Sequence, residues 1–308
     1  MVDILFPNAF EELMQLYRFA CLCAVTLYCL STACTSPVES NLITNLVGTQ
    51  ELYIDRHQKS HLSWSPDSSM IVYQTPVDTT TGGPFYTIYI YDLQQDTVRE
   101  LTPAARDRRN CFPTFAADSK TIFFTRDDQL YKMSLADGQT SPLTSTNVPP
   151  QRHLDISPDG RLIACDDGQD IHIVSVDDGA MVTASESISS PLQNPSWSPD
   201  GQRLACESPD SLIIFVFAND EIVRESAFAG EFGDITWARH ETSPFGSVIL
   251  YRNGPGIATI NPETGEIYDA FDIRKKIESF CWAPNSHDIA FSTPHSIYRA
   301  PLITTIGK

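Results

Sequence analysis

Short apolar runs alternate with turn-forming residues along most of the chain, and this pattern repeats. Each repeat holds a large apolar residue, a turn of the Ser-Pro-Asp-Gly kind and then a short apolar run. The large residues that anchor the repeats are Trp64, Phe115, Ile156, Trp197, Trp237 and Trp282. The steps between them are 51, 41, 41, 40 and 45 residues. A period in the forties with strand-like runs inside it is typical of a β-propeller with one four-stranded blade per repeat.

The turn residues favour strands over helices between the anchors. Proline fixes φ at a turn position, Asp accepts a hydrogen bond from nearby backbone, and Gly adopts positive φ. The apolar runs after the turns are 70–73, 121–124, 162–165, 203–206, 248–251 and 288–291. Third runs such as 88–91, 171–174 and 257–260, and polar fourth runs such as 98–101, complete the unit. The sequence therefore predicts an all-β fold, a six-bladed β-propeller over residues 49–308.

The last repeat is expected to borrow its outer strand from the start of the propeller. Its third run, 296–299, comes only about ten residues before the chain ends, which leaves little room for a fourth strand. Residues 50–55 lie before the first anchor at the offset of an outer strand. We therefore expect this N-terminal strand to join the last blade and close the ring, because closure protects sheet edges. The alternative is an open array of hairpins.

Residues 1–34 have the pattern of an export signal. An apolar run over 19–30 follows a short segment with Arg18, and small residues lead to Cys34. The run is short for a membrane span, which needs about 20 apolar residues, and Met14 fits better than Met1 as the start. Ala33-Cys34 resembles the lipobox of bacterial lipoproteins, although Ser31 stands where leucine is usual. The resemblance implies lipidation of Cys34, with 35–48 as a tether and an envelope or periplasmic location; cleavage and release, or an uncleaved anchor, are the alternatives.

The charge of the chain disfavours nucleic acid as a partner. The formal net charge is −18, and an acidic surface repels phosphate backbones. Cations nevertheless gather in connections between blades that should share one face. They are Arg106, Arg108, Arg109, Arg152, Arg274, Lys275 and Lys276. We interpret them as candidates for binding a partner, and the alternative is ordinary solvated loops.

Few motifs indicate chemistry. The chain has no Gly-x-Ser-x-Gly, no His-Glu-x-x-His and no Cys-x-x-Cys, so we assign no catalytic residue, cofactor or metal ligand. His61 and His153 occupy similar places in two repeats and could meet at the channel mouth, but a metal there would need a third ligand. Cys165 and Cys206 stand where other repeats have core aromatic residues, so we expect buried thiols rather than disulfides.

The repeat itself resembles a known family. Units of the form Trp-Ser-Pro-Asp-Gly, then Leu/Ile-Ala, then Ile-Tyr and Asp-Leu look like the WD40-like propeller repeats of the TolB type. The resemblance covers about residues 48–302 and departs at the fifth repeat, where Trp237-Ala238-Arg239 replaces the usual turn. It implies an exported, monomeric, non-enzymatic scaffold that binds other envelope proteins through its faces and channel.

Our prediction from the sequence is therefore an envelope-anchored, non-catalytic module for protein interaction. The alternative is a carbohydrate- or small-ligand-binding protein, or an enzyme, that uses the mouth of the channel. Fold alone does not decide between these classes. Carboxylates converging with His61 and His153 around a concave pocket would favour the enzyme.

Overall fold

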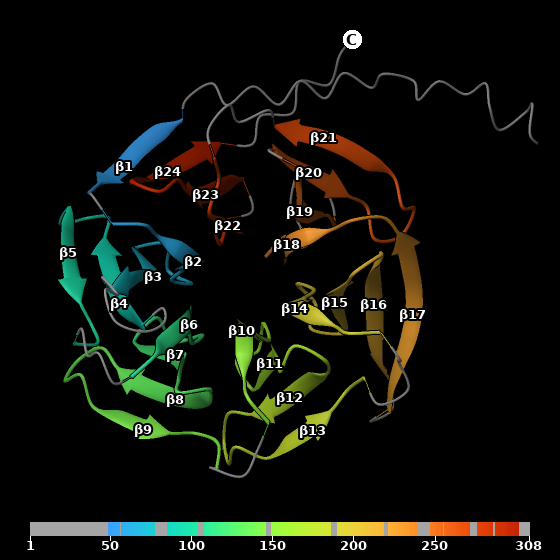
Figure 1. The fold of residues 1–308 in the computed structure, drawn as a ribbon, viewed down its shortest axis with the longest axis horizontal. Coiled ribbons are helices and arrows are strands. Elements are labelled where there is room, and N and C mark those ends of the chain that lie inside the picture. Colours follow the sequence, from blue (N-terminus) through green and yellow to red (C-terminus); the bar gives the residue numbers. More distant parts are fainter. Residues whose placement is uncertain are drawn as a thin grey trace, which may run out of the picture. The chain divides into compact units, whose positions relative to one another are not determined.

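A computed structural model gives the fold of this chain. It describes residues 49–55, 57–77, 85–103, 108–145, 149–185, 190–218, 221–239, 247–254, 256–271, 276–285 and 287–301. All of them belong to one compact unit, Ile43–Thr304. Among the described residues, twenty-four strands form six antiparallel four-stranded sheets arranged in a ring (Figure 1). The predicted all-β, six-bladed β-propeller is confirmed.

The first three blades follow each other along the chain, and each begins at the inner strand and proceeds outward. The first comprises β2 (Ser60–Trp64), β3 (Met70–Val77), β4 (Phe85–Asp92) and β5 (Thr97–Glu100). The second comprises β6 (Asn110–Phe115), β7 (Thr121–Arg126), β8 (Gln129–Ser134) and β9 (Thr140–Pro142). The third comprises β10 (Arg152–Ile156), β11 (Leu162–Asp166), β12 (Ile171–Ser175) and β13 (Met181–Thr183).

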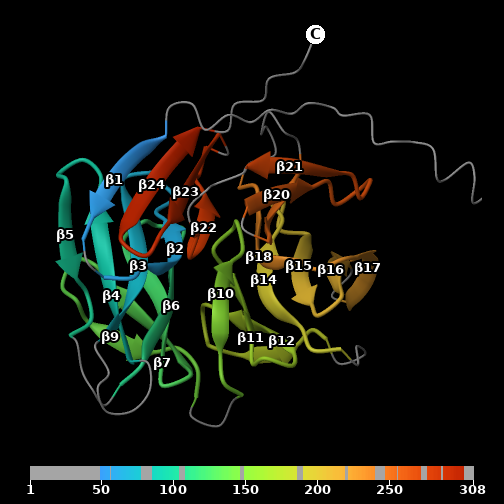
Figure 2. The same cartoon turned by 45° about the horizontal axis from the view of Figure 1, so that its top comes forward.

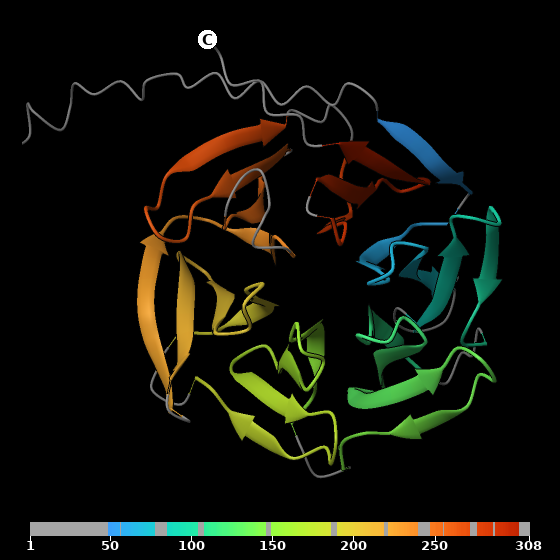
Figure 3. The same cartoon turned by 180° about the vertical axis from the view of Figure 1, so that it is seen from behind.

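The remaining blades complete the ring (Figure 3). The fourth comprises β14 (Gln193–Trp197), β15 (Arg203–Ser208), β16 (Ser211–Ala218) and β17 (Glu221–Ala229). The fifth comprises β18 (Gly233–Trp237), β19 (Ile249–Asn253), β20 (Gly256–Ile260) and β21 (Ile267–Phe271). The sixth comprises β22 (Ser279–Trp282), β23 (Asp288–Ser292), β24 (Ser296–Pro301) and β1 (Gln50–Ile54), the strand that comes first in the chain.

The ring closes as the sequence predicted. Strand β1 pairs antiparallel with β24, from Gln50 opposite Arg299 to Ile54 opposite Ser296. A buried lysine reinforces this junction: Lys59, just before β2, is fully shielded from solvent and forms an ion pair with Asp55. Its ammonium also donates to the carbonyls of His57 (2.8 Å) and His295 (3.2 Å). The connection into the first blade is thereby held against the turn before β24.

The repeat turns form for the reasons the sequence suggested. In the fourth blade the Ser198 hydroxyl donates to Asp200 (2.5 Å) and the Ser198 N–H donates to the Arg203 carbonyl (2.9 Å). Gly201 there has φ +70°, a conformation that glycine adopts without strain. The same bonds recur at Ser157 and Asp159. Each turn places an inner strand beside the channel and the second strand behind it.

The anchor residues pack between neighbouring blades. Trp197, Trp237 and Trp282 are almost completely buried, and Phe115 and Trp64 are buried as well. Burial of one large side chain of this kind stabilises the fold by about 2–3 kcal/mol. The tilted view shows inner strands β10, β14, β18 and β22 side by side around the centre (Figure 2). Packing between blades therefore fixes where the inner strands lie.

The predictions for the N-terminal segment concern residues that the structure does not describe. Residues 1–48, with Cys34, lie outside the described residues, so the export signal, lipidation and tether stay predictions. In the part of the chain that the structure describes, no helix has the length and apolar character needed to cross a membrane.

The cysteines of the described residues are buried free thiols: Cys111, Cys165, Cys206 and Cys281.

Candidate functional site

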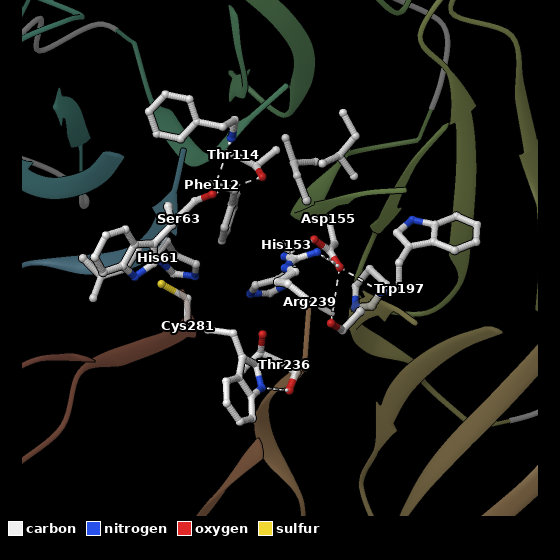
Figure 4. Close-up of a pocket in the computed structure, with 18 of the residues that line it drawn as sticks. His61, Ser63, Phe112, Thr114, His153, Asp155, Trp197, Thr236, Arg239 and Cys281 are labelled. Carbon is white, nitrogen blue, oxygen red and sulfur yellow. Dashed lines mark hydrogen bonds and ion pairs between the residues drawn. The ribbon is translucent and has the colours of Figure 1, made fainter. Parts of the chain in front are cut away.

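A cavity of about 370 Å³ occupies the centre of the ring. Its wall comes from the inner strands of all six blades: β2, β6, β10, β14, β18 and β22. Figure 4 shows ten of the lining residues labelled around one space. A pocket of this size and position is suited to a small ligand, because it offers both apolar surface and convergent polar groups.

A backbone irregularity recurs in the inner strands. In β2, β6, β10, β14 and β18 the pairing with the second strand shifts register, as in a β-bulge. One residue of each shifted segment has a left-handed φ between 45° and 52°: His61, Phe112, His153, Asn194 and Asp234. Strand β22 pairs with β23 without a shift. A bulge redirects a side chain, and bulges are common beside active sites, so all five of these side chains line the cavity.

Three of these side chains form an aromatic cluster. The rings of His61 and Phe112 lie 4.6 Å apart in an edge-to-face arrangement, and those of Phe112 and His153 are also 4.6 Å apart. The centroids of the two histidine rings are 5.6 Å apart. The expectation that His61 and His153 meet in the channel is confirmed, and both point into the same space (Figure 4).

The two histidines have different surroundings. Burial, and then the neighbouring His153, lower the pKa of His61 to about 3, so that its ring is neutral at physiological pH. No described residue hydrogen-bonds to its buried Nδ1 atom. The Nδ1 atom of His153, by contrast, lies 2.7 Å from Oδ2 of Asp166. His61 is therefore a neutral polar group within an apolar wall, whereas His153 has a carboxylate partner.

Asp166 is positioned firmly behind His153. Its side chain is completely buried, and its Oδ1 accepts the N–H of Gly168 at 3.0 Å. Its Oδ2 accepts the N–H of Asn194 at 3.1 Å, as well as bonding His153. A carboxylate on Nδ1 selects the tautomer that carries its proton there, which leaves Nε2 of His153 for a ligand. The His153 side chain is 25% exposed, so a ligand in the cavity can reach it.

An ion pair crosses the channel away from this cluster. The Arg239 guanidinium donates to Oδ1 of Asp155 (2.7 Å), joining the fifth blade to the third. Asp155 also accepts the N–H of Trp197 (2.8 Å) and is almost fully buried. Arg239 takes the place of the proline that four other repeats have in their turns, which explains the departure of the fifth repeat. Its charge therefore enters the cavity where the other blades present an apolar ring.

Sequence reasoning missed Asp166, Asp155 and Arg239 as functional residues. A signal was nevertheless present, because Gln74, Asp166 and Glu207 each lie nine residues after the serine of their repeat turn. For Arg239, the signal was the departure of its repeat from the usual turn of the Ser-Pro-Asp-Gly kind.

The cationic connections lie away from the cavity lining. Arg108 and Arg109 are exposed, and Arg109 pairs with Asp128 at 2.5 Å. Arg152 begins β10 and is partly buried, and Lys276 pairs with Glu278 at 2.8 Å. Arg106, Arg274 and Lys275 lie outside the described residues. The proposed role of this set in partner binding stays a prediction.

Among the described residues, no group of three or more His, Cys, Asp or Glu side chains could hold a metal ion. In the channel, His61 and His153 are two candidate donors, and Nδ1 of His153 already bonds Asp166. This donor set does not fit a metal centre, so we derive no step through one.

Comparison with known proteins finds similar folds among solved structures. No family model and no curated protein matches the sequence. Solved structures do match. A candidate gluconolactonase aligns with a TM-score of 0.64 at 10% identity, over 87% of this chain and 97% of that one. An oligogalacturonate lyase in complex with manganese aligns with a TM-score of 0.56 at 11% identity. An oligogalacturonate lyase from Vibrio parahaemolyticus aligns with a TM-score of 0.55 at 9% identity. Both cover 84% of this chain and 94% of theirs.

These findings bear on two predictions. At such identities a likeness establishes the fold alone, so the six-bladed propeller is confirmed while the TolB type specifically stays a prediction. The prediction of a non-catalytic module for protein interaction is wrong, because the structural neighbours are described as enzymes. The meeting of His61 and His153 at one cavity, with buried Asp166 behind His153, also favours the alternative, a ligand-binding protein or enzyme that uses the channel.

Proposed function

We propose that this propeller binds a small carbohydrate in its central channel and that His153 transfers a proton in a reaction on it. The observation that carries this proposal is the 2.7 Å contact between His153 and the fully buried Asp166 at the cavity wall. A histidine whose Nδ1 bonds a buried carboxylate is oriented by it, and the imidazolium that forms on proton uptake is stabilised. His153 Nε2 is then the general base.

The names of the neighbours suggest two reactions that need such a base. In the opening of a sugar lactone, Nε2 takes a proton from water, the resulting hydroxide adds to the carbonyl, and the ring C–O bond breaks. In β-elimination from a uronide, Nε2 takes the proton on the carbon next to the carboxylate, a C=C bond forms, and the C–O bond to the leaving sugar breaks. In both, the leaving oxygen receives a proton. Each uses the same atom of His153.

The rest of the wall supports a sugar as the ligand. The ring of Phe112 offers an apolar face to the C–H groups of a sugar, and neutral His61 packs edge-on against that ring in the same wall. Asn194 and Arg239 supply polar groups on other sides of the cavity. A wall of this mixture holds a small polyol by hydrogen bonds while excluding bulk water.

The test uses the purified protein with aldonolactones and with oligogalacturonides as separate substrates. Acid release reports lactone opening, and ultraviolet absorbance of the unsaturated product reports elimination. His153→Ala and Asp166→Asn should each lower kcat/KM by about 10²- to 10⁴-fold, the usual contribution of a general base. The control is His295→Ala, because His295 is an exposed histidine outside the cavity.

The result can also contradict the proposal. Turnover that survives in His153→Ala at the level of His295→Ala would exclude His153 as the base. If the wild type binds a sugar by calorimetry but converts none, the channel is a binding site alone, which is the second function the cavity allows. Absence of both binding and turnover across the two substrate classes would reject a carbohydrate ligand.

A further inference from the structure

A polar side chain of the second strand links neighbouring blades in three places. Gln74 accepts the N–H of Phe112 at 2.7 Å, and Asp166 accepts the N–H of Asn194 at 3.1 Å. Glu207 accepts the N–H of Ile235 at 3.0 Å. Each acceptor bonds the bulged segment of the next inner strand. These bonds therefore hold the conformations that direct side chains into the channel.

Glu207 contacts the channel wall through a further bond. Its carboxylate also hydrogen-bonds the side chain of Asn194, a residue of the channel wall. In addition, Glu207 lines another cavity of about 460 Å³, formed by segments of the fourth and fifth blades. It therefore lies between the two cavities and contacts a channel residue from behind.

From Glu207 a short series of contacts reaches the proposed base. Asn194 has a left-handed φ of 50°, and its side chain bonds Glu207 while its N–H bonds Oδ2 of Asp166. The same Oδ2 atom bonds Nδ1 of His153. Glu207 thus acts on one side of Asn194, and the carboxylate that orients the base lies on the other.

We infer that Glu207 is a positioning residue for the His153–Asp166 pair and acts on it through Asn194. This inference rests on the proposed function for its effect on turnover. Its structural part, the orientation of the His153–Asp166 hydrogen bond, stands independently of any substrate. A residue that holds the partner of a base affects the rate without touching the ligand.

The surroundings of Glu207 make its contact with the His153–Asp166 pair depend on pH. Burial and, to a smaller extent, the nearby charge of Asp234 raise the pKa of Glu207 to about 7. The hydrogen bonds from Asn194 and Ile235, and the nearby His153, lower this pKa in part. Other charged groups nearby are Asp166, Glu231 and Arg252, of which Arg252 forms an ion pair with Asp234. Glu207 therefore gains its charge near neutral pH. Ionised Glu207 accepts more strongly from Asn194 than the neutral acid does, so its hold on Asn194 and on the His153–Asp166 pair should tighten as pH rises through 7.

The experiment compares Glu207→Gln, Glu207→Ala and the control Glu231→Gln. Glu231 lines the same second cavity, is exposed, and lies outside the contacts that lead to His153. The first measurement is the low-field NMR resonance of the His153 Nδ1 proton in the ligand-free protein, recorded as a function of pH. The second is the pH profile of kcat/KM on whichever sugar is turned over.

We expect the resonance of the wild type to move with a midpoint near pH 7. Glu207→Gln should keep the resonance without that movement and should flatten the inflection in the rate profile, because glutamine accepts a hydrogen bond but does not ionise. Glu207→Ala should broaden or lose the resonance and lower kcat/KM by about 10- to 100-fold, the usual effect of a displaced catalytic group. Glu231→Gln should behave as the wild type.

The inference is overturned if both Glu207 variants keep the resonance and its pH response, as the control does. Should Glu207→Ala not fold, the comparison of Glu207→Gln with the control decides alone. If no sugar is converted but the resonance changes as expected, the proposed function fails while the positioning role of Glu207 is upheld. Turnover with an unchanged resonance upholds the function and rejects the role.

Discussion

At the scale of single residues, two histidines in equivalent positions have different partners. His61 and His153 both come from bulged inner strands, yet only His153 has a carboxylate within hydrogen-bonding distance. His61 packs edge-on against Phe112 in a buried environment that keeps it neutral. The two rings are therefore suited to different tasks, His153 to proton transfer and His61 to a neutral contact.

The low pKa of His61 makes the fold sensitive to acid. Its pKa is about 3 in the folded state and near its ordinary 6.5 when unfolded, so the unfolded state binds the proton first. The stability that neutral His61 contributes to the fold is fully present above pH 6.5 and is lost as pH falls towards 3. At about pH 4 the loss from this residue amounts to roughly 2–3 kcal/mol. His61→Phe, which keeps an aromatic ring, should lose less stability between about pH 6.5 and 4 in urea unfolding.

Exposed His295 provides the matched control for that measurement. His295→Phe should keep the acid sensitivity of the wild type, since its ring lies in solvent. Equal pH dependence in His61→Phe and the wild type would show that the His61 ring accepts a proton in the folded state and that its environment is not apolar.

The positions of these residues could be predicted from the sequence, but their partners could not. The repeat spacing aligned His61 with His153 at one level of the ring. Asp166 lies behind a bulge in a neighbouring strand, and Arg239 reaches Asp155 across 84 positions of sequence. Such partners depend on side-chain directions that a β-bulge changes, and the repeat pattern does not encode a bulge.

At the scale of elements, the closure of the ring could be predicted from the sequence. Residues 50–55 were expected to form the outer strand of the last blade, and β1 pairs with β24 over Gln50–Ile54. Lys59 was not anticipated, because a lysine before a strand ordinarily indicates a solvated position. Its full burial shows that the closure also uses a charged contact.

Removing this lysine should loosen the closure. Lys59→Met preserves much of the apolar stem but removes the ammonium that pairs with Asp55 and donates to the carbonyls of His57 and His295. We expect a loss of about 2–4 kcal/mol, in the range for breaking a partly buried pair, and a lower Tm in calorimetry. Lys132→Met, at an exposed position on β8, is the control and should leave the Tm unchanged. A Tm for Lys59→Met equal to that of Lys132→Met would show that the junction does not depend on the ammonium.

At the scale of the whole molecule, the fold followed from the repeat, whereas the function did not. Six anchors specify six blades, and five of these large residues are buried between neighbouring blades. Many propellers share such a pattern irrespective of what they bind. The channel is lined by repeat residues and also by residues in which the repeats differ, such as His153 and Arg239. A resemblance carried by the shared residues therefore predicted the architecture correctly and the activity wrongly.

The central claim is that a carbohydrate binds in the channel beside His153. The most direct measurement is a crystal structure of the His153→Ala variant with a sugar that the wild type converts or binds, because the variant should retain the ligand unreacted. We predict electron density for the sugar in the central cavity, against Phe112 and within about 3–4 Å of the space that the His153 ring vacates. A fully occupied sugar elsewhere on the protein, with the central cavity free of it at saturating concentration, would contradict the claim.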